Sequence, residues 1–242
     1  MMSTSFPADW VDRRKVIRDN PNRNPPIEQM FKAMSDNQIL HGLGHLTVVG
    51  VDPGGTTGMS VMQISYVDLV NPQTPLQGAI FGWMHGQVDC GSQSGNAAES
   101  ATAMGGLGVS ETGEAAGVAI IENIICQAAA EPAAVVIEDF IPREFNQSRD
   151  FLSPVRITAA LNQLLWELRA TTQHRQQASE AKTTCTDDRL QKWGFFEGGN
   201  SDRHARDADR HALLFLRKLR SKGSRLRAAY PIVSEAESRG LL

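Results

Sequence analysis

Two short apolar segments, each followed at once by an acidic residue, constrain this sequence most. The segments are LTVVGV at residues 46–51 and AAVVI at residues 133–137, and both are rich in β-branched residues. Short, nearly continuous apolar runs of this kind are typical of strands buried on both faces of a sheet. Asp52 follows the first run and Glu138 follows the second. If these strands are parallel neighbours, both carboxylates emerge at one edge of the sheet, where ligands of α/β proteins bind.

The remaining segments predict a mixed sheet with helices on its faces. Residues 58–65 alternate in polarity after the turn at 52–55, and residues 78–88 follow a proline-containing turn, so both are expected to be strands of an antiparallel meander. Helices are expected at residues 111–130, 154–172, 187–193 and 202–220, with a short strand within 176–182. Residues 89–110 are rich in Gly, Ser and Ala, which indicates a flexible loop. The order of elements indicates an α/β fold.

The two strand-end carboxylates are candidate metal ligands. Hard oxygen ligands facing one cavity suit Mg²⁺ or Mn²⁺ better than a softer metal. Each residue also has a simpler explanation. Asp52 begins an Asp-Pro-Gly turn, which favours aspartate for backbone reasons alone, and Glu138 could be the solvent-facing end of a strand.

The last expected helix supplies further candidates, and its geometry follows from roughly 100° of rotation per residue. An apolar stripe that includes Ala208, Ala212 and Phe215 is expected to pack on the sheet. One border of this stripe carries His204, Asp207 and His211, and the other carries Asp202, Asp209 and Leu213. Only one border can face the carboxylate edge. The pair His204 and Asp207 is favoured because the two share a face at a spacing of three residues, and the alternative is an exposed charged flank.

The overall charge does not indicate a nucleic-acid binder, whereas the C-terminal part of the chain is locally basic. The formal net charge is −3 and the pI is about 6.1. Between residues 203 and 227, however, nine basic residues stand against only Asp207 and Asp209. This block is expected either to contact phosphates or to be the solvated face of a helix.

Composition and hydropathy narrow the class of protein. The 242 residues, 41% of them hydrophobic, suffice to bury the core of one domain. No apolar stretch approaches the roughly 20 residues of a membrane-spanning helix, and the N-terminus lacks the apolar core of a signal peptide. The three cysteines have neither disulfide-framework nor zinc-site spacing. A soluble, cytoplasmic protein without a membrane partner is therefore expected.

Three motifs resemble those of RuvC-like Holliday junction resolvases, which belong to the ribonuclease H-like superfamily. Residues 49–58 (VGVDPGGTTG) resemble the first-strand motif, residues 135–140 (VVIEDF) the fourth-strand glutamate motif, and residues 204–208 (HARDA) the C-terminal helix motif. Together with residues 179–184 and 206–212, the layout is most similar to resolvases of bacteriophages that infect actinobacteria. The motifs occur in the family's order, each on the expected element.

The resemblance implies a ribonuclease H-like fold, with a mixed five-stranded sheet and helices on both faces. It implies a nuclease domain at residues 45–228, an N-terminal extension at 1–44 and a tail at 229–242. The expected activity is that of a homodimeric DNA endonuclease, acting in recombination, which nicks four-way junctions symmetrically with two Mg²⁺ (or Mn²⁺) ions per site. Asp52, Glu138 and Asp207 match the family's metal-binding acids. His204 matches the fourth position, which is an Asp in many members and a His in some.

The resemblance also implies a DNA-binding surface and leaves one register open. Lys182 resembles a family lysine that approaches DNA near the active site. The expected contacts to nucleic acid are Lys182, Arg206, Arg210, Arg217 and Lys218. In the alternative register Asp209 replaces Asp207 as the metal ligand, which leaves Arg206 in the fourth position.

Other functions are compatible with parts of the pattern. A general branched-DNA or single-strand nuclease of the same fold would share these motifs, and a non-cleaving nucleic-acid-binding pseudo-enzyme would keep the basic helix. Residues 52–58 also resemble the first phosphate loop of actin-like and sugar-kinase ATPases, but those proteins need two such domains. The tryptophans Trp83, Trp166 and Trp193 are expected to be core or interface residues rather than base-stacking platforms.

Overall fold

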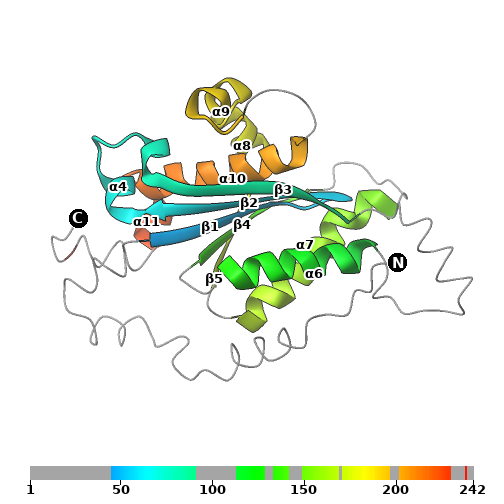
Figure 1. Ribbon diagram of the computed structural model, residues 1–242. Coiled ribbons are helices and arrows are strands. Elements are labelled where there is room, and N and C mark those ends of the chain that lie inside the picture. Colours follow the sequence, from blue (N-terminus) through cyan, green and yellow to red (C-terminus); the bar gives the residue numbers. More distant parts are fainter. Residues whose placement is uncertain are drawn as a thin grey trace, which may run out of the picture.

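The computed structural model describes residues 45–90, 113–128, 133–141, 149–168, 171–196, 202–229 and 238, which form a mixed sheet covered by helices (Figure 1). The strands are β1 (His45–Asp52), β2 (Thr56–Ser65), β3 (Ile80–Asp89), β4 (Ala133–Glu138) and β5 (Thr171–Gln176). The helices are α4 (Tyr66–Val70), the 3₁₀ turn η1 (Leu76–Ala79), α6 (Gly113–Ala128), α7 (Arg149–Leu168), α8 (Ala178–Thr184), α9 (Asp187–Trp193), α10 (Arg203–Arg220) and α11 (Arg225–Ala229).

The strand order is β3-β2-β1-β4-β5. Strand β2 pairs antiparallel with both β1 and β3, whereas β1 with β4 and β4 with β5 pair parallel. An antiparallel meander thus continues into a parallel half, as in the ribonuclease H-like fold. The predicted α/β class, with five strands in a mixed sheet and helices on both faces, is confirmed.

The parallel pairing of β1 and β4 determines where the strand-end acids lie. Val51 is aligned with Ile137, so Asp52 and Glu138 are the next residues on adjacent strands. Because the strands run in the same direction, both acids reach the same edge of the sheet. The expected adjacency of the two strands is therefore confirmed.

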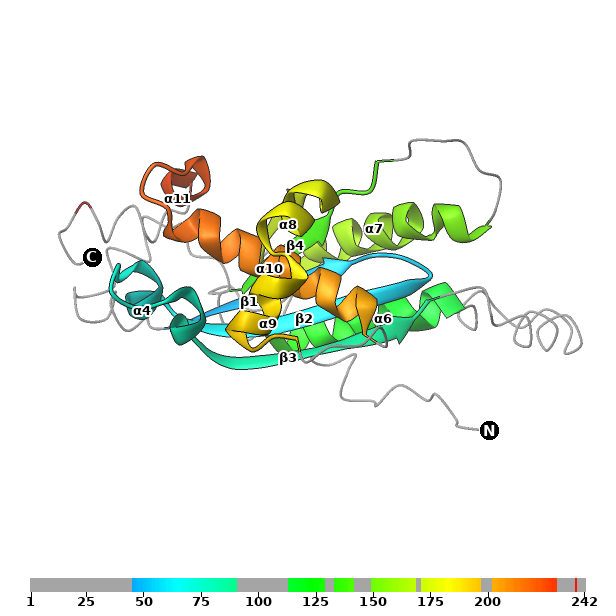
Figure 2. The same cartoon turned by 90° about the horizontal axis from the view of Figure 1, so that it is seen from above.

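Residues on the two faces of β1 enter two separate cores, which explains why its sequence is almost entirely apolar. Leu46 and Val48 face the side covered by α10, where the core includes Met62, Phe215 and Leu216. The alternate residues Val49 and Val51 face α6 and α7 and pack with side chains such as Ile121, Ile157 and Leu161. Figures 1 and 2 show this arrangement, with α8, α9 and α10 on one face and α6 and α7 on the other.

Helix α10 lies unusually close to the sheet, and two glycines make this possible. A Cβ atom at Gly50 of β1 would overlap the backbone carbonyl of Ala208, and one at Gly58 of β2 would overlap the backbone of His204. Any side chain at either position would push the helix away from the strands. The absence of a Cβ atom at these two positions therefore sets the height of α10 over the ends of β1 and β2.

Several element boundaries differ from those expected. The fifth strand is residues 171–176, and the predicted strand within 176–182 is wrong because only Gln176 of that segment is in a strand and residues 178–182 lie in α8. Segment TTQHRQ is polar, yet it pairs parallel with β4 along its whole length, and this pairing decides its conformation. Helix α7 begins at Arg149 and accommodates Pro154, although the sequence placed its start at that proline. The sequence did not predict α4 or α11.

Some expectations concern residues outside the described part of the chain. These are the N-terminal extension 1–44 with its short helix at 27–34, all but the first two residues of the loop 89–110, and most of the tail 229–242. Within the described residues, no helix is both long enough and apolar enough to cross a bilayer.

We expect Gly58→Ala to destabilise the fold, because the added Cβ would meet the backbone of α10 rather than a mobile side-chain end. Overpacking of this kind costs about 2–3 kcal/mol of unfolding free energy. The matched control is Gly86→Ala in β3, where nothing lies within 4 Å of the added atom and the change should stay within about 0.5 kcal/mol. Urea denaturation of both variants measures the difference. Equal stabilities of the two variants would show that α10 does not depend on the missing Cβ atom at Gly58 for its close contact with the sheet.

Candidate active site

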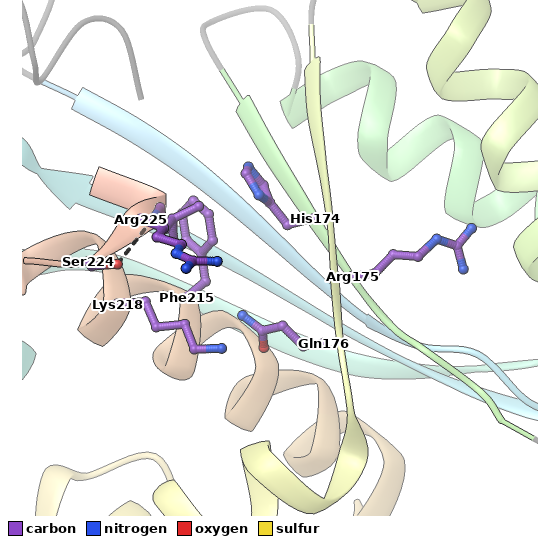
Figure 3. Close-up of a pocket in the computed structure, with 8 residues that line it drawn as sticks. His174, Arg175, Gln176, Phe215, Lys218, Ser224 and Arg225 are labelled. Carbon is purple, nitrogen blue, oxygen red and sulfur yellow. Dashed lines mark hydrogen bonds between the residues drawn. The ribbon is translucent and has the colours of Figure 1, made fainter. Parts of the chain in front are cut away.

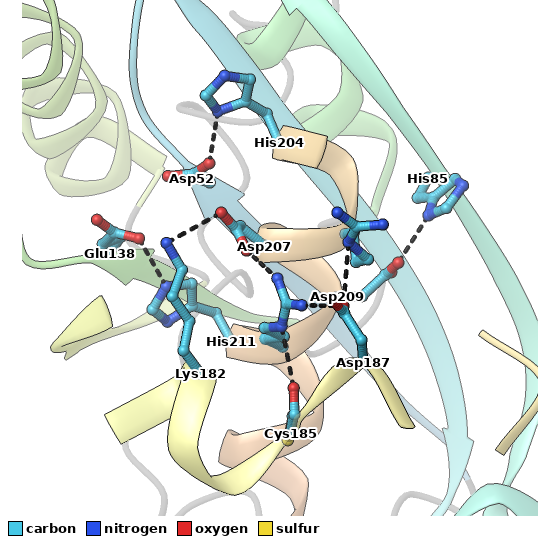
Figure 4. Close-up of polar contacts among 12 residues, drawn as sticks. Asp52, His85, Glu138, Lys182, Cys185, Asp187, His204, Asp207, Asp209 and His211 are labelled. Carbon is cyan, nitrogen blue, oxygen red and sulfur yellow. Dashed lines mark hydrogen bonds and ion pairs between the residues drawn. The ribbon is translucent and has the colours of Figure 1, made fainter. Parts of the chain in front are cut away.

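Strand β1 and the first turn of α10 meet through Asp52 and His204. Asp52 is only 7% exposed, and its Oδ2 lies 2.9 Å from His204 Nδ1 (Figure 4). The backbone N–H of His204 donates to Gln87 Oε1 of β3 at 2.9 Å, which attaches the start of α10 to the sheet. The hydrogen bond to Asp52 raises the pKa of His204 above its ordinary value, although partial burial opposes this. His204 keeps 39% of its side chain exposed and can therefore meet a ligand.

Glu138, at the end of β4, is held by a second histidine of α10. His211 is fully buried, and its Nε2 lies 3.1 Å from Glu138 Oε2. Its Nδ1 lies 3.2 Å from Oε1 of Gln176, the last residue of β5. Both ring nitrogens of His211 thus face an oxygen acceptor, and the histidine links the ends of two parallel strands.

Asp207 lies between these two pairs on α10 and is bound by two cations. One carboxylate oxygen accepts a hydrogen bond from Arg210 Nη1, and Oδ2 lies 3.2 Å from Lys182 Nζ of α8. Arg210 is buried and also binds Asp187 and the backbone carbonyl of Cys185, at 2.9 Å from Nε. Lys182 is about half exposed. Arg210 is therefore a fixed support for Asp207, whereas Lys182 lies at the surface of the cluster.

The three carboxylates lie close enough to affect one another's ionisation. Burial is the main reason that the pKa of Asp52 is raised, and the negative charges of Glu138 and Asp207 raise it further, against the hydrogen bond from His204. Burial also acts to raise the pKa of Glu138, but its hydrogen bond with His211 and the positive charges of His211 and Lys182 outweigh this and lower it. The three acids thus bring negative charge together in one place. At Asp52, the basic side chain of His204 only partly offsets the effects of burial and of the neighbouring acids.

The chemistry of this donor set fits a divalent cation. Carboxylate oxygens of Asp52, Glu138 and Asp207 are ligands that Mg²⁺ and Mn²⁺ prefer. The His204 imidazole is a nitrogen donor beside them. In the described residues no three such side chains already converge in coordination geometry. Each acid is bound instead by a basic side chain of the protein, so an incoming cation would have to replace Lys182 at Asp207 and His204 at Asp52.

Asp209, the alternative to Asp207, faces the opposite side of α10. Its side chain is fully buried, accepts a hydrogen bond from Trp83 Nε1 at 2.8 Å, and lies 2.6 Å from His85 Nδ1. The hydrogen bond to Asp209 raises the pKa of His85, against partial burial. Both partners belong to β3, so Asp209 fastens α10 to the edge strand and does not lie with Asp52 and Glu138.

The basic residues of α10 divide into two groups, which corrects part of the expected DNA-binding surface. Arg206 and Arg210 are buried: the Arg206 guanidinium lies 4.3 Å from the ring centroid of Phe196, with its Nε 3.3 Å from Asp187, and Arg210 supports Asp207. Neither is placed to contact a phosphate at the surface. Arg217 is exposed, and Lys218 is partly exposed and pairs with Glu180 at 2.6 Å.

The tryptophans also differ from one another. Trp166 is 70% exposed on α7, so it is not a core residue, and the interface role that was the other part of the expectation stays a prediction. Trp83 is partly exposed and bonded to Asp209, and Trp193 is partly buried against the α10 core.

His211 and Gln176 were not predicted from the sequence to be functional residues. The available signal was the spacing of His204, Asp207 and His211, which puts all three on one border of α10. Gln176 carried no signal because its strand was not recognised. Its role depends on the pairing of β5 with β4.

No protein-family model and no curated protein matches the sequence. Among solved structures, the chain is similar to Thermus thermophilus RuvC, with a TM-score of 0.47 and 15% identity, over 74% of this chain and 97% of that one. It is also similar to T. thermophilus RuvC in complex with Holliday junction substrate, with a TM-score of 0.42 and 14% identity, over 70% and 91% of the two chains. The fold assignment rests on the strand order and registers given above.

Arg210→Gln should destabilise the protein strongly, because it leaves Asp207 and Asp187 without their shared guanidinium. Breaking such a buried pair costs about 3–5 kcal/mol of unfolding free energy. The exposed Arg217→Gln on the same helix is the matched control and should change stability by no more than about 0.5 kcal/mol. Thermal or urea unfolding compares the two variants. Similar stabilities would mean that Arg210 is not part of the support for Asp207.

Proposed function

We propose that this protein is a metal-dependent, structure-selective DNA endonuclease that cleaves four-way junctions. The observation that carries the proposal is the group of three acids on β1, β4 and α10, with Asp52, Glu138 and Asp207 sharing one electrostatic environment at the edge of the sheet. The resemblance of the motifs around these residues to those of RuvC-like resolvases supports the same activity.

In this proposal Asp52, Glu138 and Asp207 hold the divalent ions, and His204 is the fourth ligand or moves a proton. Two Mg²⁺ or Mn²⁺ ions would supply a lowered water pKa and stabilisation of charge on the departing oxygen. Asp207 is chosen over Asp209, whose two oxygens already bind Trp83 and His85 on the other side of the helix.

The protein's own groups prepare this site before a cation arrives. His211 orients Glu138 and Arg210 orients Asp207, and both supports are buried. Such supporting hydrogen bonds keep ligands in position and limit rearrangement on binding. His204 differs, because it is partly exposed and its bond to Asp52 raises its pKa. It is therefore the group best suited to accept and release a proton next to the reacting phosphate.

Lys182 has a second role in the proposal. Its ammonium group lies 3.2 Å from Asp207 Oδ2 and is half exposed. When a cation takes over Asp207, Lys182 becomes free to contact a DNA phosphate at the same place. Arg217 and Lys218 extend the basic surface along α10, so binding should weaken steeply with salt. Selection of a four-way junction over a duplex would require two such sites in a homodimer.

The test is cleavage of a labelled four-way junction and a matched linear duplex in Mg²⁺ or Mn²⁺. We expect paired symmetric nicks in the junction only, and none with EDTA. Asp52→Asn, Glu138→Gln and Asp207→Asn should each reduce cleavage about a hundredfold or more, since loss even of a residue that supports a metal ligand typically costs 10- to 100-fold. Asp139→Asn is the matched control, because this neighbour of Glu138 is partly exposed and pairs with Arg175 at 3.6 Å.

Other outcomes would assign a different function. Binding without cutting in either metal would contradict the nuclease proposal and favour a nucleic-acid-binding pseudo-enzyme. Equal cutting of junction and duplex would keep the chemistry and exclude junction selectivity, as expected for a general nuclease of this fold. Full activity of Asp207→Asn, with loss in a folded Asp209→Asn, would reverse the choice of ligand on α10.

A further inference from the structure

A cavity of about 350 Å³ lies beside the carboxylate cluster, between β5, the C-terminal half of α10 and the start of α11 (Figure 3). Its lining consists of His174, Arg175, Gln176, Phe215, Lys218, Ser224, Arg225 and Leu226. No acidic residue is among them. The polar groups of the lining residues are two guanidiniums, an ammonium, a hydroxyl, an amide and an imidazole, most of which are hydrogen-bond donors.

The strand residues of the lining alternate in direction. The His174 ring packs against Phe215, with ring centroids 4.7 Å apart, and Gln176 points to the same face of the sheet. Arg175 turns its guanidinium away, to Asn162 at 2.8 Å and towards Asp139. Burial lowers the pKa of His174, so this ring is a neutral hydrogen-bonding group at pH 7.

Two cations remain at the cavity, and they differ in how they are bound. Lys218 pairs with Glu180 at 2.6 Å and is partly exposed. Arg225 is exposed, and in the described part of the chain its guanidinium makes no recorded hydrogen bond or ion pair. The Ser224 hydroxyl accepts from the Leu226 N–H at 3.2 Å and keeps its own hydrogen for a ligand. Planar guanidinium with nearby hydroxyl and ammonium donors is an arrangement that matches phosphate oxygens.

Gln176 connects the cavity to the carboxylate cluster. Its Oε1 faces His211 Nδ1, which leaves its amide hydrogens for the cavity. Figure 3 shows the Gln176 side chain in the lining, near Lys218 and Phe215. His211 in turn binds Glu138. Only the side chain of His211 therefore separates Gln176, in the cavity lining, from the Glu138 carboxylate of the cluster. All three lie on the same face of the sheet.

We propose that this cavity is a phosphate-binding site. It receives a phosphate of the DNA backbone that lies close to the phosphate to be cleaved. The assignment as a DNA phosphate rests on the proposed nuclease function. The chemistry it recognises is that of a phosphate ester, because the rim carries donors, the Arg225 guanidinium is unengaged in the described part of the chain, and no carboxylate is among the lining residues. Arg225 and Ser224 make the principal contacts, and the Gln176 amide contributes from the side of the cluster.

The first arm of the test measures binding of a labelled four-way junction to the full-length protein in EDTA, over a range of salt concentrations. Arg225→Gln should weaken binding about fivefold and reduce the salt slope by about one unit, as expected for the loss of one phosphate contact. Lys222→Gln is the matched control, because it removes the same charge from an exposed position in the turn just before α11 but does not line the cavity. It should change the affinity less than twofold.

The second arm titrates the full-length protein with inorganic phosphate and with thymidine monophosphate, and follows the His174 ring signals by NMR. We expect both probes to shift these signals in the wild type and neither to shift them in Arg225→Gln. Unchanged melting temperatures would show that the variants remain folded, as expected for exposed residues.

The two arms separate the possible failures. If the wild type does not bind the junction, the proposed function fails, while the second arm still tests the site. If the junction is bound but Arg225→Gln and Lys222→Gln behave alike, the DNA assignment is overturned, and a phosphate response in the second arm would then indicate a site for free phosphate esters. No response in either arm overturns the proposal entirely.

Discussion

The close contact between α10 and the strands β1 and β2 is the constraint on which the rest of the site depends. It exists because Gly50 and Gly58 have no Cβ atoms, so the helix backbone can rest directly on the sheet. The apolar stripe sets the rotation of α10 about its own axis. The border that carries His204 and His211 then lies over the ends of β1 and β4, and the border that carries Asp209 lies against β3. A small displacement of the helix would therefore separate Asp207 from Asp52 and Glu138.

The site also shows how a protein keeps several acids together before any cation binds. Each carboxylate has a basic partner, but the partners differ in exposure. Buried His211 and Arg210 are fixed supports, whereas the more exposed His204 and Lys182 can be displaced. Clustered like charges in a half-buried site are otherwise unfavourable, and burial with neighbouring acids already raises the pKa of Asp52. A divalent cation would relieve this imbalance, which gives the proposed metal dependence a physical reason.

Much of this arrangement could be predicted from the sequence, because it depends on local patterns. The apolar strands ending in Asp52 and Glu138 and the helical periodicity of residues 202–220 were sufficient to expect the parallel pair and the border of α10 that carries His204 and Asp207. What could not be predicted depends on contacts between distant segments. The burial of Arg206 and Arg210 requires Asp187 and Phe196, and β5 is a strand because of its neighbour β4 rather than its own composition.

The central claim, that Asp52, Glu138 and Asp207 together form the metal site, is tested most directly by a crystal structure determined with Mn²⁺ and anomalous scattering. The account predicts an anomalous peak among these three carboxylates, with His204 turned towards it and Lys182 displaced from Asp207. A peak beside Asp209 and His85, or Mn²⁺ bound without Asp207, would contradict it.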